Sequence, residues 1–286
     1  MEFVLVDLPD MVHFYPFSLT RSLTEIRVGI FTIKERWETH LNSECQVFTS
    51  PYLQSLYASP FLQNEDAVIY INSTCLPDLA IKNAILNLKE GESLLDKDGK
   101  WIASNSKERA IGKILLGDPN LKTTIAAKFI KNPIHLLQIH AAMIQLDFNQ
   151  VIANQTSIVV DASNRLICPE NIFIAEGASL IGVSLNATEG PIYIGKNAIL
   201  MEGAAIRGPF VLGEKAVVKM NACIYGATSV GPYCTIGGEI KNSILMGYSN
   251  KAHEGYLGDS IIGQWCNLGA GTSNSNVKNT AGPIEI

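Results

Sequence analysis

The 286-residue sequence has few charged residues and no pattern of paired cysteines. Only 17% of the residues are charged, against about 25% in an average globular protein, and the net charge is −5. A basic face for nucleic acid is therefore not expected. The six cysteines are scattered, with no C-x-x-C pair and no histidine at metal-ligand spacing, which argues against a disulfide framework and a zinc site.

Long hydrophobic runs are also absent. No stretch approaches the ~18 consecutive apolar residues of a membrane helix, and Glu2 and Asp7 interrupt the first ten residues, which argues against a signal peptide. We therefore expect a cytoplasmic protein without membrane contact. The chain is 47% hydrophobic and can bury a large interior, and its length suits two domains of about 100–200 residues each.

A six-residue repeat dominates the second half of the chain. An aliphatic residue recurs at every sixth position, and a small residue follows most of these by four positions. The aliphatic series is Ile194, Leu200, Ile206, Leu212, Val218, Ile224, Val230 and Ile236, and the small residues are Ala198, Ala204, Ala216, Ala222, Thr228 and Cys234. This period fits short strands separated by sharp corners, whereas a β-sandwich with accidental spacing does not explain the sustained register.

Three such six-residue sides form one coil of a prism, with the aliphatic side chains inside. Stacked coils predict internal ladders such as Leu200 over Val218 over Ile236. The segment resembles the hexapeptide-repeat family, which implies a left-handed parallel β-helix and a homotrimer. We expect the domains to be residues 1–156, an α/β domain, and residues 157–286, the β-helix.

The repeat is interrupted between Ile240 and Ile262, and interruptions of a rigid scaffold often carry function. The run Glu239-x-Lys241, His253-x-x-Tyr256-Leu-Gly-Asp259, Asn267-x-Gly-Ala-Gly-Thr272 and Asn276 resembles the acetyltransferase half of the bifunctional N-acetylglucosamine-1-phosphate uridyltransferase/glucosamine-1-phosphate acetyltransferases. The resemblance implies acetyl transfer from acetyl-CoA to an amino-sugar phosphate. The implied roles are general base for His253, its support for Glu239, phosphate binding for Lys241 and Tyr256, amino-sugar and acetyl contacts for Asn267 and Asn276, and acetyl-CoA binding for Ala270.

The residue types suit this chemistry independently of the resemblance. Acyl transfer to an amine needs a base that works near neutral pH, and a neutral imidazole supplies one. Other interpretations stay open: His253 is a solvated loop residue, Glu239 and Lys241 form a weak surface ion pair, or Asn267 and Asn276 cap turns. The sequence also departs from the family, because an arginine expected upstream of the lysine is missing from residues 223–226. The family continues with further coils that complete its CoA site, so we expect either that this chain is a fragment or that its acetyl-donor site is incomplete.

The first 156 residues alternate strand and helix patterns. We expect strands at residues 1–7 and 67–72, a helix that begins after Thr20 or Ser22 and reaches residue 38, a second helix at residues 79–88, a hairpin at Asp98-Gly99, and a helical tail over residues 121–130 and 134–145. This alternation predicts an α/β sheet.

The runs Phe14 to Ile30 and Ile71 to Asp78 resemble the sugar nucleotidyltransferase fold in its short, divergent branch. The resemblance implies nucleotide binding, for which Arg21 and Arg27 are the candidate phosphate ligands, and Mg²⁺ in the N-terminal domain. The glycine-rich phosphate loop is missing, and Asn72 replaces the metal-binding aspartate, with Asp78 as a doubtful substitute. We could assign no metal ligands.

The prediction is therefore a transferase that acts on a sugar phosphate or nucleotide sugar. One alternative is a non-catalytic trimeric scaffold that binds a sugar nucleotide. Another is a nucleotidyltransferase whose β-helix is purely structural.

Overall fold

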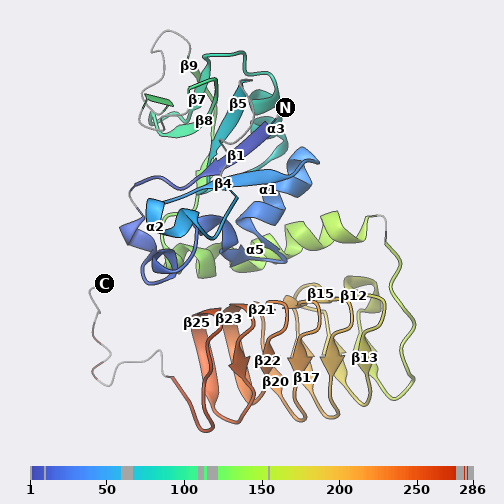
Figure 1. The fold of residues 1–286 in the computed structure, drawn as a ribbon. Helices are drawn as coiled ribbons and strands as arrows, with labels where there is room; N and C mark the ends of the chain where they lie inside the picture. The colour runs from blue at the N-terminus through green and yellow to red at the C-terminus, as the bar shows by residue number, and fades with distance from the viewer. Residues whose placement is uncertain are drawn as a thin grey trace. The chain divides into compact units, whose positions relative to one another are not determined.

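The computed structural model describes residues 2–9, 11–58, 67–108, 113–114, 122–153, 155–274, 280 and 282. Its contacts divide the chain into two compact units (Figure 1). The first comprises Met1–Ile26 and Phe31–Pro133, and the second comprises Arg27–Ile30 and Ile134–Ile286. The expected domain boundary after residue 156 differs from this division and stays a prediction. Within the described ranges, no helix is long and apolar enough to cross a membrane.

A mixed sheet forms the centre of the first unit, in the order β4-β1-β5-β8-β7-β9. Strand β1 pairs in parallel with β4 and β5, whereas β8 is antiparallel to β5 and β7. Every residue of β5 is buried, as in the continuous apolar strands at the centre of α/β sheets. The strands are β1 (Glu2–Val6), β4 (Cys45–Phe48), β5 (Val68–Asn72), β7 (Ser93–Leu95), β8 (Trp101–Ser106) and β9 (Lys122–Thr124).

These strands confirm several sequence predictions. β1 and β5 lie where strands were expected, and β7 and β8 form the hairpin at Asp98-Gly99, where Gly99 has a φ of +81°. Helix α3 (Leu79–Leu86) occupies the second expected helix. Further elements of the unit are α2 (Pro51–Gln54), β3 (Phe31–Thr32), and the antiparallel pair β6 (Cys75–Leu76) and β10 (Lys128–Phe129).

Two expectations for the first unit were wrong. The first helix, α1 (Ile33–Leu41), begins after Thr32 and not after Thr20 or Ser22, because Thr32 and Glu35 form a capping box. Ser22 caps only a 3₁₀ turn, Leu23–Glu25. Residues 122–129 form β9 and β10 in place of a helix, since both segments gain strand partners from the rest of the unit.

The second unit contains helix α5 (Pro133–Ile152), the short strand β2 (Arg27–Val28) and a parallel β-solenoid of about six turns, consistent with a left-handed β-helix. Its strands are β11 (Arg165–Ile167), β12 (Ile172–Ile174), β13 (Ser179–Leu180), β14 (Ser184–Asn186), β15 (Ile192–Ile194), β16 (Ile199–Leu200), β17 (Ala205–Arg207), β18 (Phe210–Leu212), β19 (Val217–Val218), β20 (Cys223–Ile224), β21 (Thr228–Val230), β22 (Thr235–Ile236), β23 (Glu239–Gly247), β24 (Asn250–Lys251) and β25 (Tyr256–Gln264).

The six-residue repeat builds the core of the solenoid as predicted. Leu200 pairs with Val218, and Val218 pairs with Ile236, so the expected ladder is confirmed. All three side chains are at most 2% exposed. The small residues of the repeat are also buried, because little space remains beside the corners. The inner ladders therefore bury a continuous apolar core along the axis.

The interruption of the repeat is not an extended loop. Strands β23 and β25 run through it, each turning a corner at a residue with positive φ, Asn242 or Asp259. The coils are shorter here: Ile236 pairs with Lys251, 15 positions later, whereas Leu200 pairs with Val218, 18 positions later. Stacking therefore continues, and the six-residue count fails because the coils shorten.

Candidate functional site

Three of the expected site residues share the outer face of one side of the solenoid. Glu239 and Lys241 lie two positions apart on β23 and are exposed, while Ile240 between them is fully buried. On β25, Tyr256 pairs with Glu239 and Gly258 pairs with Lys241. A Cβ on Gly258 would collide with the Tyr256 Oη, so the phenol hydroxyl lies over Gly258. The Tyr256 hydroxyl therefore lies beside Lys241, over the residue of β25 that pairs with it.

His253 lies at the exposed corner between β24 and β25. Its carbonyl oxygen stacks on Gly238, where a Cβ would lie 2.9 Å from that oxygen. Gly238 also has a φ of +73°, which a side chain disfavours. Glycine at this position lets the His253 corner approach the beginning of β23, where Glu239 follows. In the described part of the chain, the imidazole has no hydrogen-bond partner, so it can accept a proton from a ligand.

A buried lysine lies beneath this corner. The Lys251 side chain is 1% exposed and takes an inward position, in register with Ile236. Its Nζ donates to the carbonyl oxygens of His253 at 2.7 Å, Gly237 at 3.2 Å and Glu254 at 3.5 Å. Desolvation lowers the pKa of Lys251, and the charge of Glu254 partly opposes this shift. The ammonium group thus ties the His253 corner to the preceding coil.

The next coil brings two more expected residues close to this corner. Asn250 pairs with Asn267, and its Nδ2 donates to the Asn267 Oδ1 at 3.0 Å. Counted by the same spacing of 17 positions, Ala270 corresponds to His253 in the next coil. Asn267 and Ala270 are both exposed. Asn276 lies outside the described residues, so its expected contact stays a prediction.

The first unit contains a cavity of about 460 Å³ at the carboxyl ends of β1 and β4. Asp7 follows β1 in this cavity, Thr49 follows β4, and the rings of Tyr15, Phe48 and Tyr52 line the walls. Ligands of open α/β sheets bind outside the carboxyl ends of the parallel strands. The cavity therefore lies where this sheet is expected to bind a ligand.

Asp7 is a buried acidic group in this cavity. Its side chain accepts hydrogen bonds from the Ser73 Oγ at 2.7 Å and the Leu23 backbone N–H at 3.2 Å. Burial raises the pKa of Asp7, and hydrogen bonding by the hydroxyls of Thr49, Ser73 and Ser22 opposes this shift. A buried carboxyl group with a raised pKa in a cavity is a candidate for function.

Asp7 is the one carboxylate among the described residues that line this cavity. No group of three His, Cys, Asp or Glu residues in the described ranges could hold a metal ion. The Asn72 Oδ1 already accepts two hydrogen bonds from Thr74, and Asp78 caps α3 through the Ile81 N–H at 2.8 Å. We therefore derive no chemical step through a metal.

Both arginines expected to bind phosphate are engaged within the protein. Arg21 forms an ion pair with Glu25 at 3.0 Å. Arg27 is 8% exposed, and its guanidinium donates to the carbonyl oxygens of Ile30 and, at 3.4 Å, Met246. A phosphate would have to compete with these partners, and the nucleotide-binding role of the arginines stays a prediction.

Asp7 and Lys251 are two residues of these sites that were not predicted from the sequence. For Asp7 a signal was available, because it directly follows the buried strand β1 at the ligand-binding end of an expected parallel sheet. Lys251 gave a weaker signal. The shortened coil moves it to an inward position that six-residue counting does not predict.

Short stretches of the chain are similar to bifunctional proteins named GlmU. The bifunctional protein GlmU of Rippkaea orientalis is 45% identical over 53 residues, which cover 18% of this chain and 12% of the relative. The GlmU protein of Synechococcus elongatus gives the same values. That of Methanococcus aeolicus is 44% identical over 48 residues, covering 17% of this chain and 12% of the relative. The chain thus matches about an eighth of the length of these relatives.

A broader match covers the first unit and also helix α5 of the second unit. A family described as sugar nucleotidyl transferase matches residues 3–156, which are more than half of the chain. The matched region contains the parallel strands β1, β4 and β5 and the cavity around Asp7. The chain therefore belongs to the sugar nucleotidyl transferase family.

Proposed function

We propose that the β-helix transfers an acetyl group from acetyl-CoA to the amine of an amino-sugar phosphate. The observation that carries this proposal is the grouping of Glu239, Lys241 and Tyr256 on one face, beside the corner of His253. The group offers a base, a carboxylate to support it, a cation for a phosphate and a hydroxyl for hydrogen bonding.

In the proposed reaction, the His253 imidazole removes a proton from the amine as the nitrogen attacks the thioester carbonyl. The new C–N bond forms, the C–S bond breaks, and the proton passes from the imidazolium to the departing thiolate. The Glu239 carboxylate stabilises the transient imidazolium. Backbone N–H groups of the glycine-rich turn after Asn267 stabilise the oxyanion, while Lys241 and Tyr256 hold the sugar phosphate.

For the first unit, we propose binding of a nucleotide sugar or sugar phosphate in the cavity around Asp7. The family membership and the position of the cavity at the strand ends support this role. The sequence has no glycine-rich phosphate loop, and the Asn72 and Asp78 oxygens are engaged in local hydrogen bonds, which favours binding over nucleotidyl transfer. A homotrimer and a cytoplasmic location also stay predictions.

Substitution of the proposed base tests the acetyl-transfer proposal. His253→Ala should lower the rate of acetyl transfer by about 10²–10⁴-fold, because the amine loses its proton acceptor. Thiol release from acetyl-CoA, measured with glucosamine 1-phosphate as acceptor, gives the rate. The circular dichroism spectrum and melting temperature should change little, since the side chain is exposed.

His40→Ala is the matched control, because His40 lies on α1 in the first unit and its Nδ1 bonds only locally, to the Arg36 carbonyl oxygen. Its rate should equal that of the unsubstituted protein. An undiminished rate in His253→Ala would contradict the proposal. Calorimetry that detects nucleotide binding without turnover, and no acetyl-CoA binding, would favour the scaffold alternative.

A further inference from the structure

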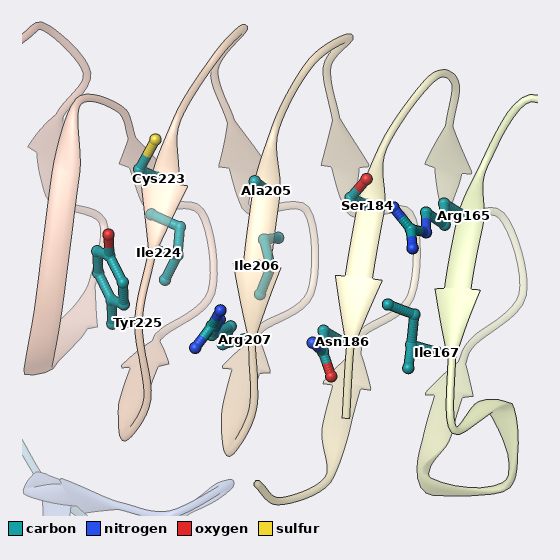
Figure 2. A pocket seen from close by; sticks show the side chains of 10 residues that line it. All are labelled: Arg165, Ile167, Ser184, Asn186, Ala205, Ile206, Arg207, Cys223, Ile224 and Tyr225. Atoms are coloured by element: carbon teal, nitrogen blue, oxygen red, sulfur yellow. The ribbon is translucent and has the colours of Figure 1, made fainter. Parts of the chain in front are cut away.

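The outer face that carries Glu239 and Lys241 continues over four earlier strands, where it is hollowed (Figure 2). Two rows of outward side chains run across β11, β14, β17 and β20. The first row is Arg165, Ser184, Ala205 and Cys223, and the second row is Ile167, Asn186, Arg207 and Tyr225. The first row leads in register to Glu239. We call the hollow between these rows the arginine groove.

The arginine groove has a volume of about 300 Å³. It exists because the first row contains only small side chains after Arg165. Its apolar lining comes from Ile167, Ala205 and the Tyr225 ring, because Ile206 and Ile224 turn their side chains into the solenoid core. The groove therefore combines apolar and polar lining, which suits a ligand that has both an apolar ring and charged groups.

The charge of the groove is positive although the whole chain is acidic. Arg165 and Arg207 line it, and no carboxylate does. Arg207 contacts Glu189 at 3.5 Å, but both side chains are more than half exposed, so the pair contributes little and a ligand can displace it. Arg165 has no ion-pair partner in the described ranges. Planar guanidinium groups bind phosphate oxygens with paired hydrogen bonds.

Two further side chains complete the groove. The Asn186 Oδ1 accepts hydrogen bonds from the Thr188 N–H at 3.1 Å and from the Thr188 hydroxyl at 2.7 Å. These bonds fix the side-chain amide so that its N–H groups point away from Thr188 and can donate to a ligand. Tyr225 is 42% exposed, and its ring lines the groove. An exposed aromatic ring can stack on a planar base.

The spacing of the cations indicates the size of the ligand. Lys241, Arg207 and Arg165 lie on β23, β17 and β11, each two strands from the next. With about 4.8 Å between strands, the two arginines of the groove are separated by roughly 10 Å along the stack, which is more than a single phosphate can contact. We propose that the arginine groove binds a nucleoside diphosphate, with the phosphates on the two arginines and the base beside the Tyr225 ring.

This inference deepens the proposed function. The identity of the molecule that carries the nucleoside diphosphate rests on that function, whereas binding in the groove does not. The nucleoside diphosphate belongs either to a nucleotide-linked amino sugar, which is the acetyl acceptor, or to acetyl-CoA, which is the acetyl donor. Both sources present the same phosphates and a planar base. Binding in the groove can be measured without turnover, so its failure is distinct from a failure of His253 as base.

Hydrogen exchange of the full chain, detected by mass spectrometry, tests the proposal. Uridine diphosphate, adenosine diphosphate, CoA and inorganic phosphate are titrated separately, and protection is followed in residues 182–190 and 203–212. We expect a nucleoside diphosphate or CoA to protect both segments. Arg207→Gln and Arg165→Gln should each weaken this binding about 10- to 100-fold, the effect of losing a hydrogen-bonded charge pair.

Lys196→Gln is the matched control, because it removes one exposed positive charge from the same solenoid outside the groove. It should change the affinity by less than about twofold. Protection by uridine diphosphate assigns the groove to a nucleotide-linked sugar, and protection only by CoA or adenosine diphosphate assigns it to the donor. Equal protection by inorganic phosphate, no protection, or full affinity in Arg207→Gln would overturn the proposal.

Discussion

Burial of the Asp7 carboxylate destabilises the folded protein, and the hydrogen bonds of this group only partly offset the effect. The carboxyl group is 5% exposed, and burial raises its pKa although hydroxyl groups surround it. A folded-state pKa above the unfolded value means that the folded protein holds the proton more tightly. Stability therefore falls as the pH rises from the unfolded pKa through the folded pKa. A residue that costs stability at neutral pH and lines a cavity is a candidate for ligand binding.

We predict that Asp7→Asn is more stable than the unsubstituted protein at pH 7. The amide is uncharged and can still accept from the Leu23 N–H while it donates to the Ser73 or Thr49 hydroxyl. The gain should be about 1.4 kcal/mol for each unit by which the pKa of Asp7 is raised. Urea unfolding between pH 4 and pH 8 measures it, and the difference should vanish toward pH 4.

The same variant should bind nucleotide sugars more weakly in the first unit, if the carboxylate contacts the ligand. Asp96→Asn is a control, because Asp96 lies in the exposed turn between β7 and β8 and is not part of the cavity. A loss of stability at pH 7 in Asp7→Asn would contradict the prediction and assign the carboxylate a purely structural role.

At the scale of elements, the corner between β24 and β25 depends on a charge inside the solenoid. Lys251 replaces an aliphatic residue in the inner ladder, and its ammonium group holds the carbonyl oxygens of His253 and Glu254. Burial of an ammonium group costs several kcal/mol before its hydrogen bonds are counted. The solenoid could be built without this charge, so we interpret Lys251 as a positioning residue for the His253 corner.

Lys251→Met should separate positioning from stability. Methionine keeps much of the apolar stem in the core, so the melting temperature should change little. The corner loses its two hydrogen bonds from the ammonium group, to His253 and Glu254, and acetyl transfer should slow by at least about tenfold. The lowered pKa of Lys251 makes the unsubstituted protein gain stability as the pH rises from the folded pKa toward 10.5, and the variant should lack this gain. Kinetics and pH-dependent unfolding measure the two effects.

Lys215→Met provides the comparison, because that lysine is exposed on the same solenoid and bonds to the Tyr233 hydroxyl at 2.9 Å. Its rate should be unchanged. If Lys251→Met retained full activity with a large loss of stability, the lysine would be a core residue without influence on the corner.

For the whole molecule, a feature could be predicted from the sequence when the residues that determine it lie close together in the chain. The solenoid follows from a short repeat, so its ladders and the shared face of Glu239 and Lys241, two positions apart, were predictable. The position of Lys251 was not, because it requires knowing that a coil shortens from 18 to 15 positions. The beginning of α1 was missed because several Ser and Thr residues compete as caps, and only Thr32 completes a capping box.

The sequence also did not predict that residues 27–30 belong to the second unit, because this depends on contacts between residues more than 100 positions apart in the chain. The Ile30 N–H donates to the Asp147 Oδ2 on α5 at 2.8 Å, and the Gly29 carbonyl accepts from the Ser229 Oγ at 2.9 Å. Gly29 has a φ of +74°, and a Cβ there would collide with the Asp147 carboxylate. A short N-terminal segment is thus a structural part of the unit that carries the β-helix.

We predict that Gly29→Ala loosens the second unit. The positive φ alone should cost about 1–2 kcal/mol, and displacement of Asp147 from the Ile30 N–H should add about 1–3 kcal/mol. Gly99→Ala is the matched control, since Gly99 also has a positive φ but a Cβ there would contact nothing within 4 Å. Hydrogen exchange should accelerate in α5 and in β21 and β23 for Gly29→Ala, and only around β7 and β8 for Gly99→Ala. Unchanged exchange in α5 would show that residues 27–30 do not stabilise the second unit. The contacts that assign these residues to the second unit would then contribute little to its stability.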